Sequence, residues 1–130
     1  MFLLDRMVSW RVSPAWFVAE AVVDPACPLF DEERRGLPSW VAFEYMAQGI
    51  AALSGIQRLC EGSGSPKIGF VIGLRDFKTE VSFFPQGARV RIEAEELMRD
   101  GPVVSFSCLA ECLGQRTRAI LNAIETELDP

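Results

Sequence analysis

A run of small and apolar side chains over residues 37–55 constrains this chain more than any other feature. Pro38 and Ser39 open the run, and Ser39 is of the type that caps the first turn of a helix. Apolar side chains then follow nearly all the way round a helical wheel, which is typical of a helix buried in the middle of a fold. We therefore expect one long central helix that starts just after Pro38 and ends near Leu59 or Cys60.

Two polar side chains stand in this apolar helix. Glu44 and Gln48 are four residues apart in the sequence, so they lie on the same helical face. A buried carboxylate is costly unless it is paired, hydrogen-bonded or used in catalysis. Glu44 is therefore the first candidate for a functional residue. The alternative is a structural carboxylate that Gln48, Tyr45 or a nearby arginine satisfies.

The other segments are typical of β strands. Either β-branched and aromatic residues or an alternation of apolar and charged residues predicts strands at 7–12, 16–23, 67–80, 89–98, 103–113 and 117–127. A loop is expected at 28–38, and turns are expected at 61–66, 83–87 and 99–102. Short connections between the last three strands predict an antiparallel meander. The fold class is then α+β, with one buried helix against a curved antiparallel sheet in a single domain over residues 1–130.

Charge and composition argue against several classes of function. The net charge is −5, from 13 basic and 18 acidic side chains, and the densest basic cluster is Arg34-Arg35, so no nucleic-acid partner is expected. Glu44 and Gln48 argue against a membrane-spanning helix, and the first residues lack a signal-peptide pattern, which favours a cytoplasmic protein. Four cysteines without a C-x-x-C pair, and no histidine, predict neither a zinc site nor another metal or cofactor.

The segment around Glu44 resembles a known motif. Pro38, then Glu44-Tyr45-Met46-Ala47-Gln48, is similar to the Pro-Gly-x-x-x-x-Glu-Ala-Met-Ala-Gln segment of the hot-dog-fold 3-hydroxyacyl-[acyl-carrier-protein] dehydratases. The tyrosine in the second position, with Leu-Pro-x-Trp ahead of it, resembles the branch associated with aryl-polyene biosynthesis more closely. Gly69-Phe70 and Phe84-Pro85-Gln86-Gly87 extend the resemblance, which covers residues 16–127. It implies a hot-dog fold, in which the sheet wraps the central helix.

The resemblance also implies a reaction, the removal of water from a 3-hydroxyacyl thioester. A base takes the proton at C2, an acid protonates the leaving hydroxyl, and backbone N–H groups at the helix N-terminus receive the thioester carbonyl. Glu44 takes the place of the family's helix carboxylate, which acts across a dimer interface. Gln48 is expected to hold that carboxylate or the backbone. The positions that correspond to substrate-binding residues are Ser39, Trp40, Gln48, Gly69 and Phe70.

One residue of the family pattern is missing. In the relatives that this chain resembles, the base is a histidine of a His-Pro-Leu/Phe-Phe stretch before the helix, and Cys27-Pro28-Leu29-Phe30 stands there in this chain. A free thiol is mostly protonated at neutral pH, and the thiolate is the reactive form. Cys27 is therefore a candidate substitute for the base. The alternatives are an ordinary loop thiol and a residue of redox control.

Three functions stay open on the sequence. The first is an active dehydratase that uses Glu44 with Cys27 or another polar group. The second is a non-catalytic hot-dog subunit that binds acyl chain or carrier, or pairs with a histidine-bearing paralogue and lends it Glu44. The third is a hot-dog acyl thioesterase. The expected partners are an acyl carrier protein or a coenzyme A thioester, and a second hot-dog subunit in a homodimer or heterodimer. Arg34 and Arg35 are candidate carrier-binding residues, because a carrier protein is acidic, or else they are solvated surface charges.

Overall fold

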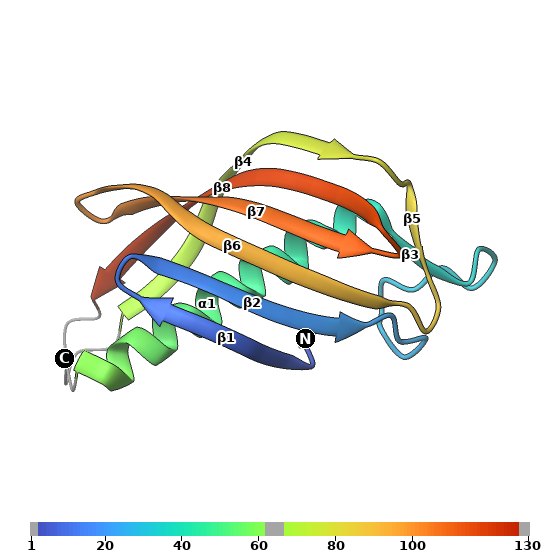
Figure 1. Ribbon diagram of the computed structural model, residues 1–130, viewed down its shortest axis with the longest axis horizontal. Helices are drawn as coiled ribbons and strands as arrows, with labels where there is room; N and C mark the ends of the chain where they lie inside the picture. The colour runs from blue at the N-terminus through green and yellow to red at the C-terminus, as the bar shows by residue number, and fades with distance from the viewer. Residues whose placement is uncertain (1–2, 62–66, 128–130) are drawn as a thin grey trace.

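A curved antiparallel sheet wraps one long helix (Figure 1). The computed structural model describes residues 3–61 and 67–127, and within these the side chains of residues 60–72, 126 and 127 are outside the described part. The elements are β1 (Arg6–Val12), β2 (Ala15–Val22), β3 (Gly36–Pro38), the 3₁₀ helix η1 (Ser39–Val41), α1 (Ala42–Glu61), β4 (Lys67–Thr79), β5 (Phe83–Pro85), β6 (Arg89–Asp100), β7 (Val103–Cys112) and β8 (Gln115–Glu127). The predicted α+β class and the hot-dog arrangement are confirmed.

The main sheet has six strands in the order β1-β2-β6-β7-β8-β4. β6, β7 and β8 pair in sequence order and antiparallel, as the predicted meander requires. β2 joins the meander on one side, where Phe17 faces Ala94, and β4 joins it on the other side through β8. The six predicted strands therefore all form, and their ends differ from the prediction by at most two residues.

Small side chains let the sheet approach the helix closely. On β2 the inward-facing positions include Ala15, Ala19 and Ala21, which are all buried. Phe17 lies between them, and a Cβ on Gly49 of α1 would come within 2.2 Å of its ring. The glycine therefore makes room for the aromatic ring where helix and sheet are nearest. Met46, Ile50 and Leu53 of α1 complete the buried core on this side of the sheet, in which Phe17 is one of the largest side chains.

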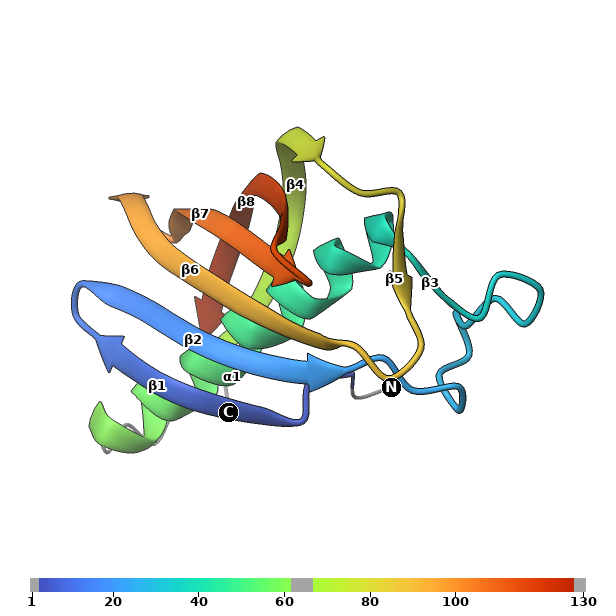
Figure 2. The ribbon, with the colours of Figure 1, turned by 45° about the vertical axis from the view of Figure 1, so that its right-hand side comes forward.

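Two short strands correct the prediction of a loop at 28–38 and a turn at 83–87. β3 and β5 pair antiparallel, with Gly36 opposite Pro85 and Pro38 opposite Phe83. Figure 2 shows this pair beside the first turns of α1, apart from the main sheet. A Cβ on Gly36 would lie 2.2 Å from the carbonyl oxygen of Phe84, so the pairing depends on glycine. Three-residue strands have too few positions to show an alternation in the sequence.

The helix starts differently from the prediction. η1 precedes α1, the residue before its first turn is Pro38, and no side chain caps it, so the prediction that Ser39 is the cap is wrong. The backbone N–H of Ser39 instead donates to the carbonyl oxygen of Ser82 at 3.0 Å. The helix extends to Glu61, slightly past the predicted end. Of the turn predicted at 61–66, residues 62–66 lie outside the described residues.

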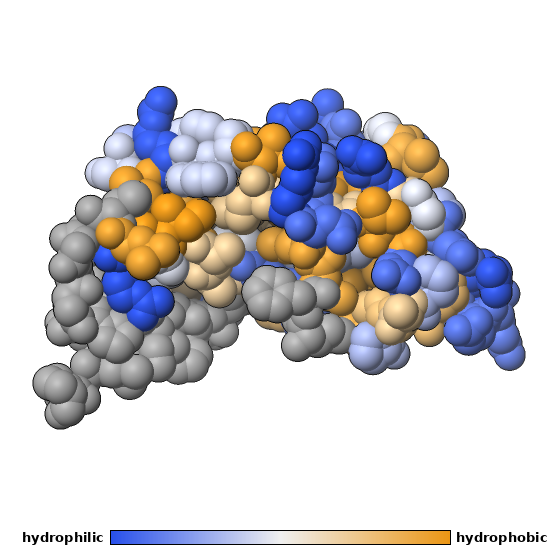
Figure 3. Space-filling view, turned by 90° about the horizontal axis from the view of Figure 1, so that it is seen from below, coloured by the Kyte–Doolittle hydropathy of each residue, from blue (hydrophilic) through white to orange (hydrophobic). Residues whose placement is uncertain are grey.

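β4 forms one edge of the sheet. Its only partner among the described strands is β8, so its other edge is open. Leu74 on this strand is exposed. Viewed from below, hydrophobic side chains occur in groups that hydrophilic side chains separate (Figure 3). In the part of the chain that the structure describes, no helix has the length and hydropathy to cross a bilayer.

Candidate functional site

The loop after β2 places Cys27 beside the start of α1. Asp24 organises this loop, because its Oδ1 accepts a hydrogen bond from the Ala26 N–H at 2.8 Å and its carbonyl oxygen accepts one from the Cys27 N–H at 3.0 Å. The carbonyl oxygen of Cys27 in turn accepts a hydrogen bond from the Phe30 N–H at 2.9 Å. Cys27 is half-buried and free of any disulfide. The loop therefore holds the thiol in a fixed place.

Cys27 lines a pocket of about 260 Å³ at the N-terminal end of α1, here called the helix-end pocket. Its polar lining consists of Asp5, Asp24, Cys27 and Tyr45. Its apolar lining consists of Leu3, Val22, Ala26, Pro28 and Leu37. These residues come from the N-terminal segment, β2, the loop that follows it, β3 and α1. The lining contains two carboxylates and no basic side chain.

Tyr45 is the most deeply buried polar residue of this pocket, with 1% of its surface exposed. Its ring stacks against Phe84 of β5 with the centroids 6.5 Å apart. Burial raises the pKa of Tyr45 well above its ordinary value, and the negative charges that Cys27, Cys112 and Asp5 can carry raise it further. The phenol therefore stays protonated at any physiological pH. Its hydroxyl makes no hydrogen bond to any described residue.

Glu44 precedes Tyr45 in the chain but lies outside the helix-end pocket. Neighbouring residues of a helix point about 100° apart, so Tyr45 and Glu44 face different surroundings. The carboxylate is half-buried in the first turn of α1 and has no hydrogen bond or ion pair with any described residue. The structure thus brings Cys27 together with Tyr45 and not with Glu44 of the same chain. The structural alternative, in which Gln48, Tyr45 or an arginine satisfies Glu44, finds no support among these residues.

Gln48 holds the backbone of the N-terminal segment. Its Oε1 accepts hydrogen bonds from the N–H groups of Leu3 at 2.8 Å and Leu4 at 3.3 Å. Of the two roles expected for Gln48, holding backbone is therefore the one seen. Because Leu3 lines the helix-end pocket, Gln48 also positions one of its walls.

The other predicted site residues lie around the same end of the helix or along β4. Ser39 is buried, and its N–H already donates to the carbonyl oxygen of Ser82, whereas Trp40 is 53% exposed. Gly69 and Phe70 belong to β4, but their side-chain positions lie outside the described part of the chain. Their assignment as substrate-binding residues stays a prediction.

The two arginines before the helix are exposed. The guanidinium of Arg34 lies over the ring of Phe83 at 4.6 Å from its centroid, and Arg35 is 3.8 Å from the carboxylate of Glu32. Arg35 also adopts a left-handed backbone conformation, with φ of 59°. Both cations remain accessible from solvent, so their role in carrier binding stays a prediction.

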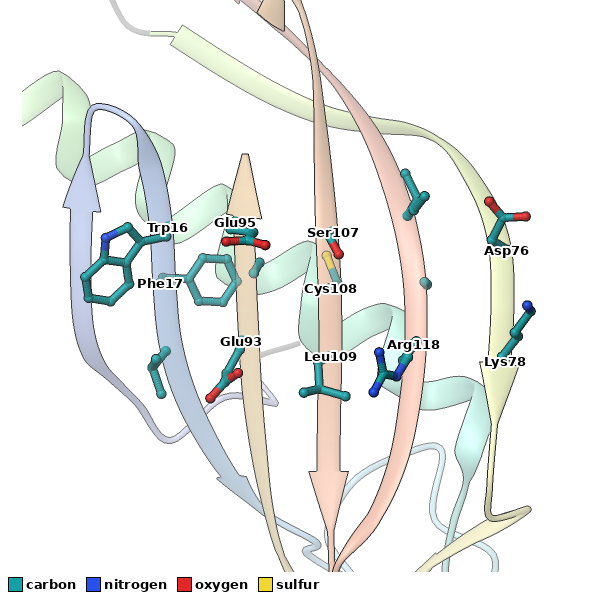
Figure 4. A pocket seen from close by; sticks show the side chains of 14 residues that line it. Trp16, Phe17, Asp76, Lys78, Glu93, Glu95, Ser107, Cys108, Leu109 and Arg118 are labelled. Atoms are coloured by element: carbon teal, nitrogen blue, oxygen red, sulfur yellow. The ribbon is translucent and has the colours of Figure 1, made fainter. Parts of the chain in front are cut away.

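A larger hollow, of about 890 Å³, lies on the face of the sheet away from α1 and is here called the outer hollow (Figure 4). Trp16, Glu93, Glu95, Leu109 and Arg118 are among the side chains over it, and Phe17 and Cys108 form part of its floor. None of the predicted site residues lines it. Among the described residues, no group of three histidine, cysteine, aspartate or glutamate side chains is placed to hold a metal ion.

Sequence reasoning did not assign Tyr45 to the site. It is the only tyrosine of the chain, and it follows Glu44 in an otherwise apolar helix, which is a signal that was available. The orientation of Tyr45 toward Cys27 depends on how the loop after β2 folds over the helix, and the residue pattern of the helix does not contain that information.

Comparison with known proteins gives a family and a fold. A family model described as ApeP-like, ApeP dehydratase, matches residues 1–129. No curated protein matches the chain. Among solved structures, the dehydratase heterocomplex ApeI:P from Xenorhabdus doucetiae aligns with a TM-score of 0.80 at 25% identity, over 96% of this chain and 83% of that chain.

More distant structures share the fold alone. A hypothetical thioesterase protein with coenzyme A from Streptococcus pneumoniae aligns with a TM-score of 0.69 at 9% identity, over 96% of this chain and 88% of that chain. A protein from Streptococcus mutans bound to acetyl CoA aligns with a TM-score of 0.71 at 9% identity, over 100% of this chain and 94% of that chain.

Proposed function

The chain belongs to the ApeP-like dehydratase family, and from that premise we propose that it serves the dehydration of 3-hydroxyacyl thioesters as one subunit of a dimeric hot-dog site. In this proposal it binds the acyl chain and contributes Glu44 to a site that a partner subunit completes. The observation that carries the proposal is the half-buried Glu44 carboxylate, which has no hydrogen bond or ion pair within the described residues of its own chain.

The chemistry requires a base for the C2 proton, and Cys27 is poorly supported in that role. A thiol becomes a good base as thiolate, and a neighbouring cation is what usually favours that form. The lining of the helix-end pocket offers the carboxylates of Asp5 and Asp24 but no basic side chain. We therefore assign the base to the partner subunit, as a histidine of a second hot-dog chain, and treat Cys27 as a pocket residue.

Glu44 is suited to the second requirement of the reaction, the departure of the hydroxyl group. It lies in the first turn of α1, where unpaired backbone N–H groups and the helix dipole favour negative charge. A carboxylate at this point can hold the leaving hydroxyl and exchange a proton with it. Because Glu44 lies outside the pocket that contains its own Cys27, it is oriented for a substrate shared with the partner.

The open edge of β4 is the surface that we assign to the partner. An unpaired strand edge presents a row of backbone donors and acceptors that a strand of another chain can use. β4 is 13 residues long and pairs on one side only among the described strands. The relative from Xenorhabdus doucetiae is a heterocomplex, which supports a heterodimer here.

An acyl carrier protein is the proposed donor of the thioester. Arg34 and Arg35 are exposed in the loop before β3, near the N-terminal end of α1, and can meet an acidic carrier. Reversing both charges, as Arg34→Glu with Arg35→Glu, should raise the KM for a carrier-linked substrate and leave the KM for the coenzyme A thioester unchanged. Equal effects on both substrates would contradict carrier docking at this loop.

The test of the proposed function compares the chain alone with the chain co-purified with a histidine-bearing hot-dog paralogue. Dehydration of 3-hydroxybutyryl thioesters, carrier-linked and coenzyme A-linked, is followed by the absorbance of the enoyl product. We expect the pair to be active and the chain alone to be at least about 100-fold slower, because it lacks a general base. Cys27→His in the chain alone should restore part of the activity.

Two results would contradict the proposal. Full activity of the chain alone that disappears in Cys27→Ala would make Cys27 the base. An active pair whose rate is unaffected by Glu44→Gln would remove Glu44 from the site.

A further inference from the structure

Leu113, at the turn between β7 and β8, combines two unfavourable features. It is 72% exposed, although its side chain is large and apolar. Its backbone is left-handed, with φ of 51°, a conformation that brings the Cβ of an L-amino acid too close to the following carbonyl oxygen. Glycine, asparagine and aspartate are the residues that ordinarily occupy this conformation. With most of its surface in water, Leu113 gains little from its own chain, which points to a contact outside the chain.

The hairpin requires this backbone conformation. Cys112 and Gln115 pair as the end residues of β7 and β8, so Leu113 and Gly114 alone connect the two strands. Both connecting residues have positive φ, as in a type I′ turn, whose twist matches that of the flanking strands. Gly114 adopts this conformation freely because it has no Cβ, whereas Leu113 does not. The two-residue turn therefore holds the leucine in a fixed place at the hairpin tip.

Other exposed leucines differ from Leu113 in their backbone. Leu59 in α1 is 83% exposed and Leu97 in β6 is 52% exposed, and neither has a positive φ. Among the described residues other than glycine, Arg35 and Asp76 share the positive φ, and both are polar. Single exposed apolar side chains are ordinary on protein surfaces. The combination of exposure with an unfavourable backbone is what separates Leu113 from them.

The hairpin tip lies at the end of the molecule where α1 begins. The N–H of Glu80, just after β4, donates to the carbonyl oxygen of Arg116 at 2.9 Å, and the N–H of Arg116 donates to Glu80 Oε1 at 2.7 Å. Close by in the chain, the carbonyl oxygen of Ser82 accepts the N–H of Ser39 at the start of η1. β7 ends on the side of the molecule where β3 and β5 lie (Figure 1). Leu113 is therefore at the end that receives the thioester in the proposed function.

Exposed cations accompany the leucine at this end. Arg116, three residues further along, has a side chain that is 52% exposed, and its guanidinium is 3.7 Å from the Glu111 carboxylate. Arg34 and Arg35 are exposed in the loop before β3, on the same side of the molecule. An apolar side chain with cations around it is complementary to a protein surface that presents apolar side chains among carboxylates. An acidic protein is therefore the partner that this tip fits.

We propose that Leu113 is a docking residue for the acyl carrier protein, which covers the leucine side chain while its carboxylates meet Arg116. This inference rests on the proposed function and deepens it, since it names an apolar contact for the same carrier. The thioester carbonyl is received at the N-terminus of α1 in that proposal, so the carrier that delivers the thioester lies at this end. The second subunit is assigned to the edge of β4 instead.

Leu113→Asn tests the inference because docking and stability should change in opposite directions. Asparagine suits the left-handed position and removes the apolar side chain, so the Tm should rise by roughly 3 °C. The same variant should raise the Kd for a 3-hydroxybutyryl-loaded acyl carrier protein by about tenfold, because a covered leucine is lost. Fluorescence anisotropy of the labelled carrier, titrated with the purified chain in its native oligomeric state, measures the Kd.

Two further variants complete the test. Leu97→Asn is the matched control, since it removes an exposed leucine from β6 outside the tip and should leave the Kd within about twofold. Leu113→Gly also suits the left-handed turn and covers the case in which Leu113→Asn does not fold; its Kd should rise as well. In the active pair, Leu113→Asn should raise the KM for the carrier-linked substrate and leave the KM for 3-hydroxybutyryl-coenzyme A unchanged.

The outcomes separate this inference from the proposed function. An unchanged Kd in Leu113→Asn, or a Tm that falls in both Leu113 variants, would overturn the docking role. A lower oligomer mass of Leu113→Asn in light scattering would make the second subunit the occupant and also overturn it. A pair that binds the carrier through Leu113 but dehydrates neither thioester would contradict the proposed function and leave the docking residue in place.

Discussion

The helix-end pocket and the outer hollow differ in volume, in solvent exposure and in the kinds of side chain that line them. The outer hollow is larger, about 890 Å³ against about 260 Å³. Its charged side chains are mostly accessible to solvent, as Glu95 and Arg118 are. The helix-end pocket instead places a half-buried thiol and a buried phenol among apolar side chains. Volume alone therefore does not identify the functional region of this fold.

The difference arises from how each region is built. The outer hollow lies over one face of the main sheet, and its side chains come from neighbouring strands, β2, β6, β7, β8 and β4. The helix-end pocket needs five separate segments to meet at the start of α1. Two of these segments are held by backbone N–H groups that donate to Asp24 Oδ1 and to Gln48 Oε1. Such an arrangement removes polar groups from water. Hydrogen bonds to a ligand are stronger there, because the local dielectric constant is lower.

The largest expected effect is the loss of kcat when the Glu44 carboxylate is removed, compared with removal of a carboxylate over the outer hollow. In the active pair, Glu44→Gln should lower the dehydration kcat by at least about 100-fold, because the substitution keeps the shape and removes the proton carrier. Glu95→Gln is the matched control, as it changes an exposed carboxylate over the outer hollow. It should leave kcat within about twofold. Similar losses in both variants would contradict the distinction between the regions.

Two glycines of α1 provide the next test, which concerns the floor of the outer hollow. A Cβ on Gly49 would come within 2.2 Å of the buried Phe17 ring, so Gly49→Ala should lower the free energy of unfolding by about 1–3 kcal/mol. Gly55 has nothing within 4 Å of its Cβ position, so Gly55→Ala should raise that free energy by about 0.5–1 kcal/mol. Urea denaturation of both variants measures the difference. If both substitutions changed the free energy of unfolding in the same direction, the helix would not pack on Phe17 as described.

The smallest expected effect concerns two thiols, one from each region. Burial raises the pKa of Cys108, beneath the outer hollow, to about 12, so at pH 8 only about one thiol in ten thousand is ionised. Cys27 is half-buried and lines the helix-end pocket. In a Cys60→Ser background, Cys27 should react with iodoacetamide at least about tenfold faster than Cys108, as peptide mass spectrometry can measure. Comparable rates would mean that the sheet interior is open to the reagent.

Much of the fold could be predicted from the sequence because its signals are local. The apolar run around Met46 predicts the helix, and the alternation of Val90 and Ile92 with charged residues predicts β6 and its buried face. The pairing of β3 with β5 could not be predicted, since it joins two three-residue segments that are far apart in the chain. The same holds for Ser39, whose N–H bonds to Ser82 through tertiary contact rather than through a helix cap.

The sequence indicated which positions could form the candidate site, but it did not indicate how their side chains are oriented. The resemblance assigned Cys27 and Glu44 to one site, and both lie near the start of the central helix, yet the resemblance gave no direction for either side chain. Which of the neighbours Glu44 and Tyr45 faces Cys27 depends on how the loop after β2 lies on the helix. In the proposed function, the interaction partner of Glu44 belongs to another chain. One sequence alone cannot predict such a partner.

Protection of Cys27 from alkylation tests most directly the claim that the helix-end pocket, and not the larger outer hollow, belongs to the functional region of this chain. The rate of iodoacetamide modification is measured without ligand and with saturating 3-hydroxybutyryl-coenzyme A, in the wild type and in Ser107→Cys, which places a reporter thiol at the outer hollow. We predict that the ligand slows modification of Cys27 by at least about tenfold and leaves the reporter unchanged. A protected reporter beside an unprotected Cys27 would place the ligand on the outer face of the sheet and contradict the account.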